Sequence, residues 1–112
     1  MPRGTKNKSV NHKKVIQERS RLMILTKLAS SPVKKMSFTD LKETLGFTAG
    51  NLSVHLKYLE KVGYVSIEKR FEGNKPLTTI CLTDDGYRAL EEYLKEMEHI
   101  IKSLKESGGF YE

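Results

Sequence analysis

The sequence predicts a mainly helical domain with one small antiparallel β-hairpin and a long helix at its C-terminal end. Three observations predict this class. Apolar residues recur at helical spacing before residue 63, alternate with a period of two between residues 65 and 82, and return to helical spacing from residue 87 to residue 104. A chain of 112 residues fits one domain. Three helices, a hairpin and a last helix are therefore expected to share one core.

The first helix is expected from about Val15, because apolar residues from there to Leu28 fall on one helical face. Pro32 lies just beyond it and cannot continue a helix. Residues 1–13 contain Pro2 and Gly4 and show no period. They are expected to form a flexible basic arm, so the folded domain is expected to cover residues 14–105.

A short second helix is expected after Ser37. The segment Ser37-Phe38-Thr39-Asp40 resembles a capping box, with Asp where Glu or Gln is usual. Gly46 is expected to end this helix in the left-handed conformation.

The third helix is expected over about residues 48–62, with Thr48 as its N-cap. Leu52, Leu56 and Leu59 form its buried stripe. The opposite face is small, polar and basic and contains no acid. It comprises Gly50, Val54, Lys57 and Lys61, with Asn51 and Tyr58 on one flank and Ser53 on the other.

The hairpin is expected because Val65 and Ile67 alternate with polar residues, as do Ile80 and Leu82. The turn-rich segment 71–76 separates the two strands and predicts a loop longer than a two-residue turn. The hairpin tip is expected to carry three cations, Lys69, Arg70 and Lys75.

The last helix is expected over about residues 84–106, capped by Thr83, and residues 107–112 are expected to form a frayed tail. Its apolar residues form a heptad-like seam about 27 Å long. A lone domain of this size would struggle to cover such a stripe, so we expect the seam to join two copies as a homodimer. The expected interface residues are Tyr87, Leu90, Leu94, Met97, Ile101 and Leu104.

Charge is unevenly distributed along the chain. The net charge is +6, yet residues 1–35 hold ten Lys or Arg and one acid, whereas residues 84–112 hold four bases and eight acids. This asymmetry suggests one face for a polyanion and another turned away from it, although a solvated charged surface would look the same.

The expected location is cytoplasmic. No apolar stretch approaches the length of a membrane span, and the basic N-terminus lacks the apolar core of a secretory signal. Cys81 is the single cysteine, so no internal disulfide can form and a reducing compartment is expected.

Two short helices joined by a tight turn and followed by a basic hairpin are typical of the winged helix-turn-helix. The second of these helices, the recognition helix, would enter the major groove of double-stranded DNA, where small outward residues allow close approach to base edges. The hairpin, or wing, would lie along flanking phosphates or the minor groove.

The sequence also resembles the small archaeal and bacterial winged-helix regulators related to the MarR and ArsR groups, over about residues 18–105. The resemblance is carried by the segments Arg21-Leu22-Met23-Ile24-Leu25, Phe38-Thr39-Asp40-Leu41, Leu45 to Glu60, Gly63-Tyr64-Val65, Lys75-Pro76 with Thr78, and Leu82-Thr83-Asp84-Asp85-Gly86. It implies a DNA-binding transcription regulator that dimerises through its terminal helices. Leu77 departs from the pattern, because the family often has Arg at that position as a wing contact to DNA.

The DNA-binding residues expected from these arguments are Thr48, Gly50, Asn51, Ser53, Val54, Lys57, Lys69, Arg70, Lys75 and Thr78. Asn51 is expected to pair with adenine, and Val54 is expected to contact a thymine methyl. Lys57 is expected to reach guanine acceptors or a phosphate, and Ser53 and Thr48 are expected to bond to a base or a phosphate. The wing cations are expected to contact phosphates. A competing interpretation remains open, in which the winged helix is a protein-interaction module of a larger transcription or trafficking complex.

Other chemistries find little support in the sequence. Metal sensing needs clustered ligands. The candidate ligands are far apart in the sequence and form no ligand pair at helical spacing, so no metal or cofactor is expected; they are Cys81, His12, His55 and His99. No catalytic motif is present, and an enzyme is not expected. A small-molecule effector stays open, because Tyr87 and Tyr93 could line a pocket beside the last helix or simply pack there.

Overall fold

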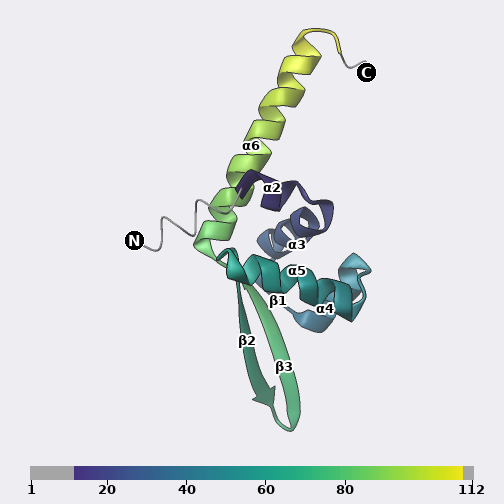
Figure 1. Cartoon of the computed structure of the whole chain (residues 1–112), viewed down its shortest axis with the longest axis vertical. Helices are drawn as coiled ribbons and strands as arrows, with labels where there is room; N and C mark the ends of the chain where they lie inside the picture. Colours follow the sequence, from purple (N-terminus) through teal and green to yellow (C-terminus); the bar gives the residue numbers. More distant parts are fainter. Residues whose placement is uncertain (1–11, 110–112) are drawn as a thin grey trace.

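The structure is a computed structural model that describes residues 12–109, apart from the side chains of His12, Lys13 and Gln17. In chain order its elements are α2 (His12–Gln17), α3 (Arg19–Ser30), β1 (Lys35–Ser37), α4 (Phe38–Leu45), α5 (Ala49–Lys61), β2 (Val65–Glu72), β3 (Lys75–Leu82) and α6 (Asp84–Glu106). The helices gather around one core, the hairpin of β2 and β3 projects from it, and α6 runs out in the opposite direction (Figure 1). The predicted fold class is confirmed.

Short polar side chains begin three of these helices, as the sequence predicts. The side-chain oxygens of Ser37, Thr48 and Thr83 accept hydrogen bonds from the backbone N–H three residues later, at 3.0, 3.1 and 3.0 Å. The Thr83 hydroxyl also donates to the Gly63 carbonyl at 2.7 Å, which joins the start of α6 to the turn after α5. Because these caps are local, the observed bounds of α5 and α6 lie within one residue of the predicted ones.

The N-terminal helix is divided, whereas the sequence predicted a single one. Glu18 has an extended backbone and separates α2 from α3, and its side chain accepts a hydrogen bond from the Arg21 N–H at 3.1 Å. Val15 and Ile16 are buried in the core, and this burial holds α2 against the domain. The folded chain therefore includes His12, two residues before the predicted domain start, and residues 1–11 of the expected arm lie outside the described part.

The sheet has three strands, not the two of a hairpin alone. The short strand β1 pairs antiparallel with β3, with Met36 opposite Ile80, which gives the order β1-β3-β2. Sequence periodicity missed β1 because three residues are too few to show an alternation. Its pairing fixes the segment between α3 and α4 against the core.

The hairpin loop is shorter than predicted. Strand pairing continues to Glu72 opposite Lys75, so only Gly73 and Asn74 form the turn. Gly73 has a φ of 64°, and Asn74 is not among the residues with positive φ, a pattern typical of the type II′ turn that suits two-residue hairpins. The predicted loop over residues 71–76 is therefore wrong, and the wing is a longer continuous ladder.

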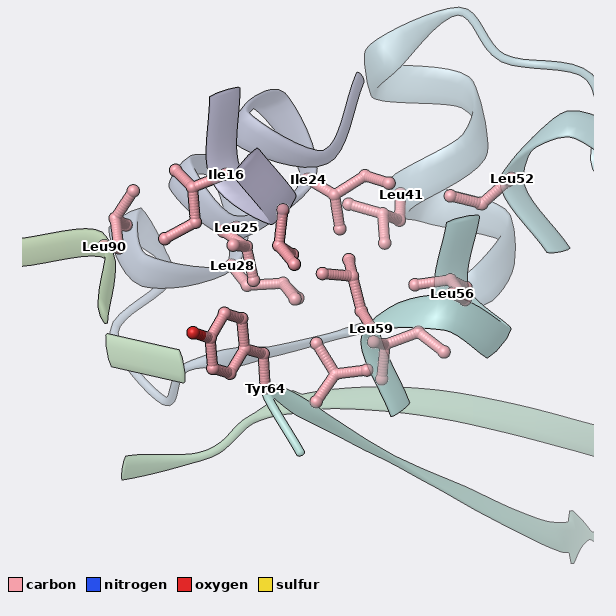
Figure 2. Close-up of a cluster of buried hydrophobic side chains, with 13 residues drawn as sticks. Ile16, Ile24, Leu25, Leu28, Leu41, Leu52, Leu56, Leu59, Tyr64 and Leu90 are labelled. Atoms are coloured by element: carbon pink, nitrogen blue, oxygen red, sulfur yellow. The ribbon is translucent and has the colours of Figure 1, made fainter. Parts of the chain in front are cut away.

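The core is a single apolar cluster to which α2 to α6 and the sheet all contribute. Figure 2 shows the side chains of α3, α4 and α5 pointing toward one another, with Tyr64 and Leu90 closing one side. Leu52, Leu56 and Leu59 all lie in this cluster, which confirms the predicted buried stripe of the third helix. No helix within residues 12–109 combines the length and the apolar character needed to cross a membrane.

Candidate nucleic-acid interface

The outward face of α5 is fixed by the residues that this helix buries. Because Leu52, Leu56 and Leu59 point into the core, the opposite side must face solvent. The α5 residues predicted to contact DNA are all exposed there: Gly50, Asn51, Ser53, Val54 and Lys57. Val54 is apolar and still 66% exposed. Thr48 is exposed at the N-cap, so the structure brings every predicted α5 residue onto one free surface.

A three-residue turn holds α5 against α4. Gly46 ends α4 in the left-handed conformation with a φ of 72°, as predicted. The Phe47 N–H donates to the Lys42 carbonyl at 3.1 Å, and the half-buried Phe47 side chain packs against the core. The packing of this helix-turn-helix therefore fixes the direction in which the outward face of α5 points.

The wing divides its predicted cations between two faces. Side chains opposite each other in the ladder share a face, so Lys69 lies with Thr78, and Arg70 lies with Leu77. Lys69 and Thr78 share their face with the core residues Ile67 and Ile80, which is the face toward α5. Arg70 and Lys75 lie on the other face, together with the acids Glu68 and Glu72. The sequence placed the three cations together at one tip, and the structure separates them.

A hollow of about 280 Å³ lies between α5 and the wing. Its lining comes from α4, α5, β2 and β3 and comprises Phe38, Ser53, Leu56, Lys57, Ile67, Lys69, Thr78 and Ile80. Leu56 and Ile80 are buried and form its floor, whereas Ser53, Lys57 and Lys69 are exposed at its rim. The hollow is thus continuous with the outward face of α5.

Arg21 also contacts α5, a role that the sequence does not predict. Its guanidinium carbon lies 4.5 Å from the centre of the Tyr58 ring, and its Nε donates to the Val15 carbonyl at 2.9 Å. One side chain thereby connects α2, α3 and the flank of α5. The position of Tyr58 beside the outward face was readable from the sequence, but no periodicity pairs it with an arginine 37 positions earlier.

The predicted interface helix α6 has an exposed apolar stripe with one exception. Leu90 is only 3% exposed and packs within the core of its own chain, so it is not available to a partner. The other five predicted residues, Tyr87, Leu94, Met97, Ile101 and Leu104, are exposed, and Ile100 is exposed beside them. Beyond its first turns α6 extends away from the body of the domain (Figure 1).

A second hollow, of about 580 Å³, lies between α3 and α6. Tyr87 lines it together with Leu94 and Met97, whereas Tyr93 is absent from its lining and packs against the core cluster. The structure therefore separates the two tyrosines that the sequence grouped as candidates for an effector pocket.

The metal-binding residue types do not gather at one place in the described part of the chain. Among the side chains that the structure describes, no three from His, Cys, Asp or Glu are placed to hold a metal ion. His55 is half-buried at the edge of the α5 stripe, and its Nδ1 atom is buried without a hydrogen-bond partner. Burial raises the pKa of the Tyr64 phenol to about 12, with smaller effects from the nearby charges of Asp85 and Glu92.

Comparison with known proteins agrees with this geometry. The family model of the winged helix DNA-binding domain matches residues 20–101, which span α3, the sheet, α4, α5 and most of α6.

Among individual proteins, an uncharacterised HTH-type transcriptional regulator of Bacillus subtilis is 34% identical over 85 residues, covering 76% of this chain. The match spans half the length of that relative. A solved transcriptional regulator homologue from Pyrococcus horikoshii has a TM-score of 0.75 at 27% identity, covering 81% of this chain and 88% of its own. A MarR family transcriptional regulator from Streptomyces coelicolor shares the fold, with a TM-score of 0.66 at 18% identity over 89% of this chain and 69% of its own.

Proposed function

The chain belongs to the winged helix DNA-binding domain family, and from this premise we propose that it binds specific double-stranded DNA as a homodimer and so regulates transcription. The relatives named above that have a stated function are transcription regulators and not enzymes. The observation that carries the proposal is the outward face of α5. It is exposed along its whole length, it is held rigidly by the core on its opposite side, and it presents small, polar and basic side chains.

The chemistry of this face suits base edges in the major groove. Asn51 can form two hydrogen bonds with adenine, and the exposed methyl groups of Val54 can contact the methyl group of thymine. Gly50 has no side chain and lets the helix backbone come close to the groove floor. Thr48 and the N–H groups at the start of α5 favour a DNA phosphate.

The dimer rests on the exposed stripe of α6. Two copies packed through Leu94, Met97 and Ile101 would remove this stripe from water. A twofold dimer would place its two α5 helices in successive major grooves about 34 Å apart. Half-sites are therefore expected about 10 base pairs from each other.

The proposal is tested by selecting bound duplexes in vitro and then titrating a selected and a scrambled duplex at one salt concentration. The wild-type protein is expected to select a palindromic site. Losing a bidentate base contact costs about 1–3 kcal/mol, so Asn51→Ala should weaken the selected duplex about tenfold or more while the scrambled duplex is little affected. Folding should be unchanged, because Asn51 is exposed.

Ser103→Ala is the matched control, because Ser103 is an exposed polar residue at the far end of α6. It should leave both affinities at wild-type values. If Asn51→Ala and Lys57→Ala both leave the ratio of the two affinities unchanged, the α5 face does not read sequence. In that case the protein-interaction function becomes the better explanation.

A further inference from the structure

We infer that Lys57 of α5 and Lys69 of β2 bind one and the same DNA phosphate, in the hollow between the recognition helix and the wing. The inference rests on the proposed DNA binding and adds the backbone contact that connects the helix to the wing.

The first observation is that the two lysines converge although they come from different elements. Both line the hollow of about 280 Å³, together with the hydroxyl-bearing residues Ser53 and Thr78. Ser53 and Lys57 reach it from α5, whereas Lys69 and Thr78 reach it as directly opposed residues of the wing. Two lysines and two hydroxyl-bearing residues therefore line the same hollow.

The second observation is the charge of this hollow. No acidic residue lines it, and within the described part of the chain neither Lys57 nor Lys69 forms an ion pair. Two like charges held at one hollow repel each other, and a bound anion relieves that repulsion. Lysine together with Ser and Thr hydroxyls is a common set of donors to DNA phosphate oxygens.

The third observation identifies the anion as part of a duplex. Lys57 belongs to the outward face of α5, so a ligand in the hollow lies directly beside a duplex bound to that face. The buried floor of Leu56 and Ile80 is apolar and suits the carbon atoms of a deoxyribose next to the phosphate. A nucleotide of the bound DNA supplies both the anionic phosphate and the deoxyribose carbon atoms.

The opposite face of the wing provides an internal contrast. There Arg70 and Lys75 are accompanied by Glu68 and Glu72, and Lys75 lies directly opposite Glu72 in the ladder. Two cations and two acids leave this face without net charge. Arg70 is therefore a matched control for Lys69, one position away in the sequence but on the other side of the wing.

The experiment measures the salt dependence of duplex affinity for the wild-type protein, Lys57→Ala, Lys69→Ala and the double variant. Each phosphate neutralised contributes about 0.9 to the slope of log affinity against log salt. If both lysines share a phosphate, each single variant still neutralises it and keeps a slope near that of the wild type. The double variant should lose about 0.9 per bound protomer. If each single variant already loses about 0.9 and the double variant about 1.8, the lysines use separate phosphates and the inference is wrong.

A second measurement locates the phosphate by replacing the backbone phosphates of the selected duplex one at a time with uncharged methylphosphonates. One position per half-site should weaken wild-type binding and have no further effect on the double variant. The Lys57→Ala/Arg70→Ala variant should remain sensitive at that position, because Lys69 is still present. Loss of this sensitivity, or the lack of any such position, would overturn the inference.

These outcomes are separate from a failure of the proposed function. A wild-type protein that does not bind any duplex contradicts DNA binding itself, whereas normal binding with additive lysine effects contradicts only the shared phosphate. All three substituted side chains are exposed, and thermal unfolding of each variant checks that the fold is kept.

Discussion

Two glycines within helices have opposite surroundings, and this difference gives each a separate role. A Cβ atom at Gly86, in the first turn of α6, would lie 2.2 Å from the Tyr64 carbonyl oxygen and 2.9 Å from the Cδ1 atom of Leu82. A Cβ atom at Gly50 in α5 would have no atom within 4 Å. Packing within the domain therefore requires glycine at position 86. In the absence of DNA, the domain has room for a larger side chain at Gly50.

Alanine at these two positions should change stability in opposite directions. Gly86→Ala forces α6 away from the backbone of Tyr64 and should lower the free energy of unfolding by about 1–3 kcal/mol, the usual cost of overpacking. Gly50→Ala should raise it by about 0.5–1 kcal/mol, because alanine is the better helix former at an exposed site. Urea unfolding of both variants measures this. The account of Gly86 fails if its variant is as stable as the wild type.

Gly50→Ala has a second expected result that depends on DNA. The added methyl group lies on the outward face of α5, so it should weaken binding to the selected duplex even though the free protein is more stable. Duplex titration at one salt concentration measures this loss. An affinity equal to that of the wild type would mean that the α5 backbone does not approach the groove floor at this point.

Tyr64 gives the folded domain a defined response to alkaline pH. Its pKa rises from 10.0 to about 12 in the folded chain, chiefly because the residue is buried and only 4% exposed. The folded state therefore keeps the phenol proton at pH values where the unfolded state releases it. This contribution to stability is complete below pH 10 and is lost as the pH rises from 10 toward 12.

The corresponding measurement is the free energy of unfolding between these pH values. Tyr64 should contribute a fall of at most about 1.4 kcal/mol per pH unit. Tyr64→Phe should flatten the curve, because it removes the phenol whose pKa is raised in the folded state. The same slope in the wild type and Tyr64→Phe would show that this phenol titrates alike in both states.

At the scale of the elements, the features that the sequence predicted well depend on neighbouring residues. Thr48 and Thr83 bond to backbone groups three residues away, so the starts of α5 and α6 can be read directly. The outward face of α5 follows from the spacing of three leucines. The exposed face of the candidate site can therefore be predicted from the sequence alone.

Features that depend on pairing between distant segments could not be read in this way. β1 exists because Met36 meets Ile80, which is 44 positions later. The two faces of the wing depend on the length of the turn, because a loop over residues 71–76 would leave Lys69, Arg70 and Lys75 together at its edge. The two-residue turn extends the ladder and turns Lys69 toward Lys57.

The seam of α6 also has a feature that the sequence does not predict, because it depends on contacts with distant segments. Leu90 and Leu94 are one turn apart and both belong to the heptad-like seam, yet Leu90 is buried and Leu94 is 45% exposed. The difference arises where α6 leaves the body of the domain, and that point is set by packing against α2 and α3. Periodicity identifies an apolar stripe but does not say which part of it the chain covers itself.

At the scale of the whole molecule, the two ends of the fold have different chemistry. The hollow between α5 and the wing is basic, whereas residues 84–112, which include α6, hold four bases and eight acids. The α6 helix projects away from the hairpin in Figure 1. This separation fits an arrangement in which α6 joins two copies on the side remote from DNA, because its acids would be repelled by phosphates.

A single charge on the exposed part of α6 should therefore divide the proposed dimer without unfolding the domain. Leu94→Asp places a carboxylate in the apolar stripe, and a twofold interface contains two such charges without partners, at a cost of several kcal/mol. Sedimentation at micromolar concentration should show a dimer for the wild type and a monomer for Leu94→Asp, with the wild-type helix content retained. Met97→Asp should behave in the same way.

Ser103→Asp introduces the same charge on the same helix but off the apolar stripe, so it should remain dimeric. The Leu94→Asp monomer should bind a single half-site as the wild-type subunit does and lose the tighter binding to the full palindrome, because the two α5 helices are no longer linked. A wild-type protein that sediments as a monomer, or a Leu94→Asp variant that stays dimeric, would contradict the assignment of this stripe as the interface. If the monomer nevertheless bound the palindrome as tightly as the wild type, DNA recognition would not depend on the dimer, and each α5 would act alone.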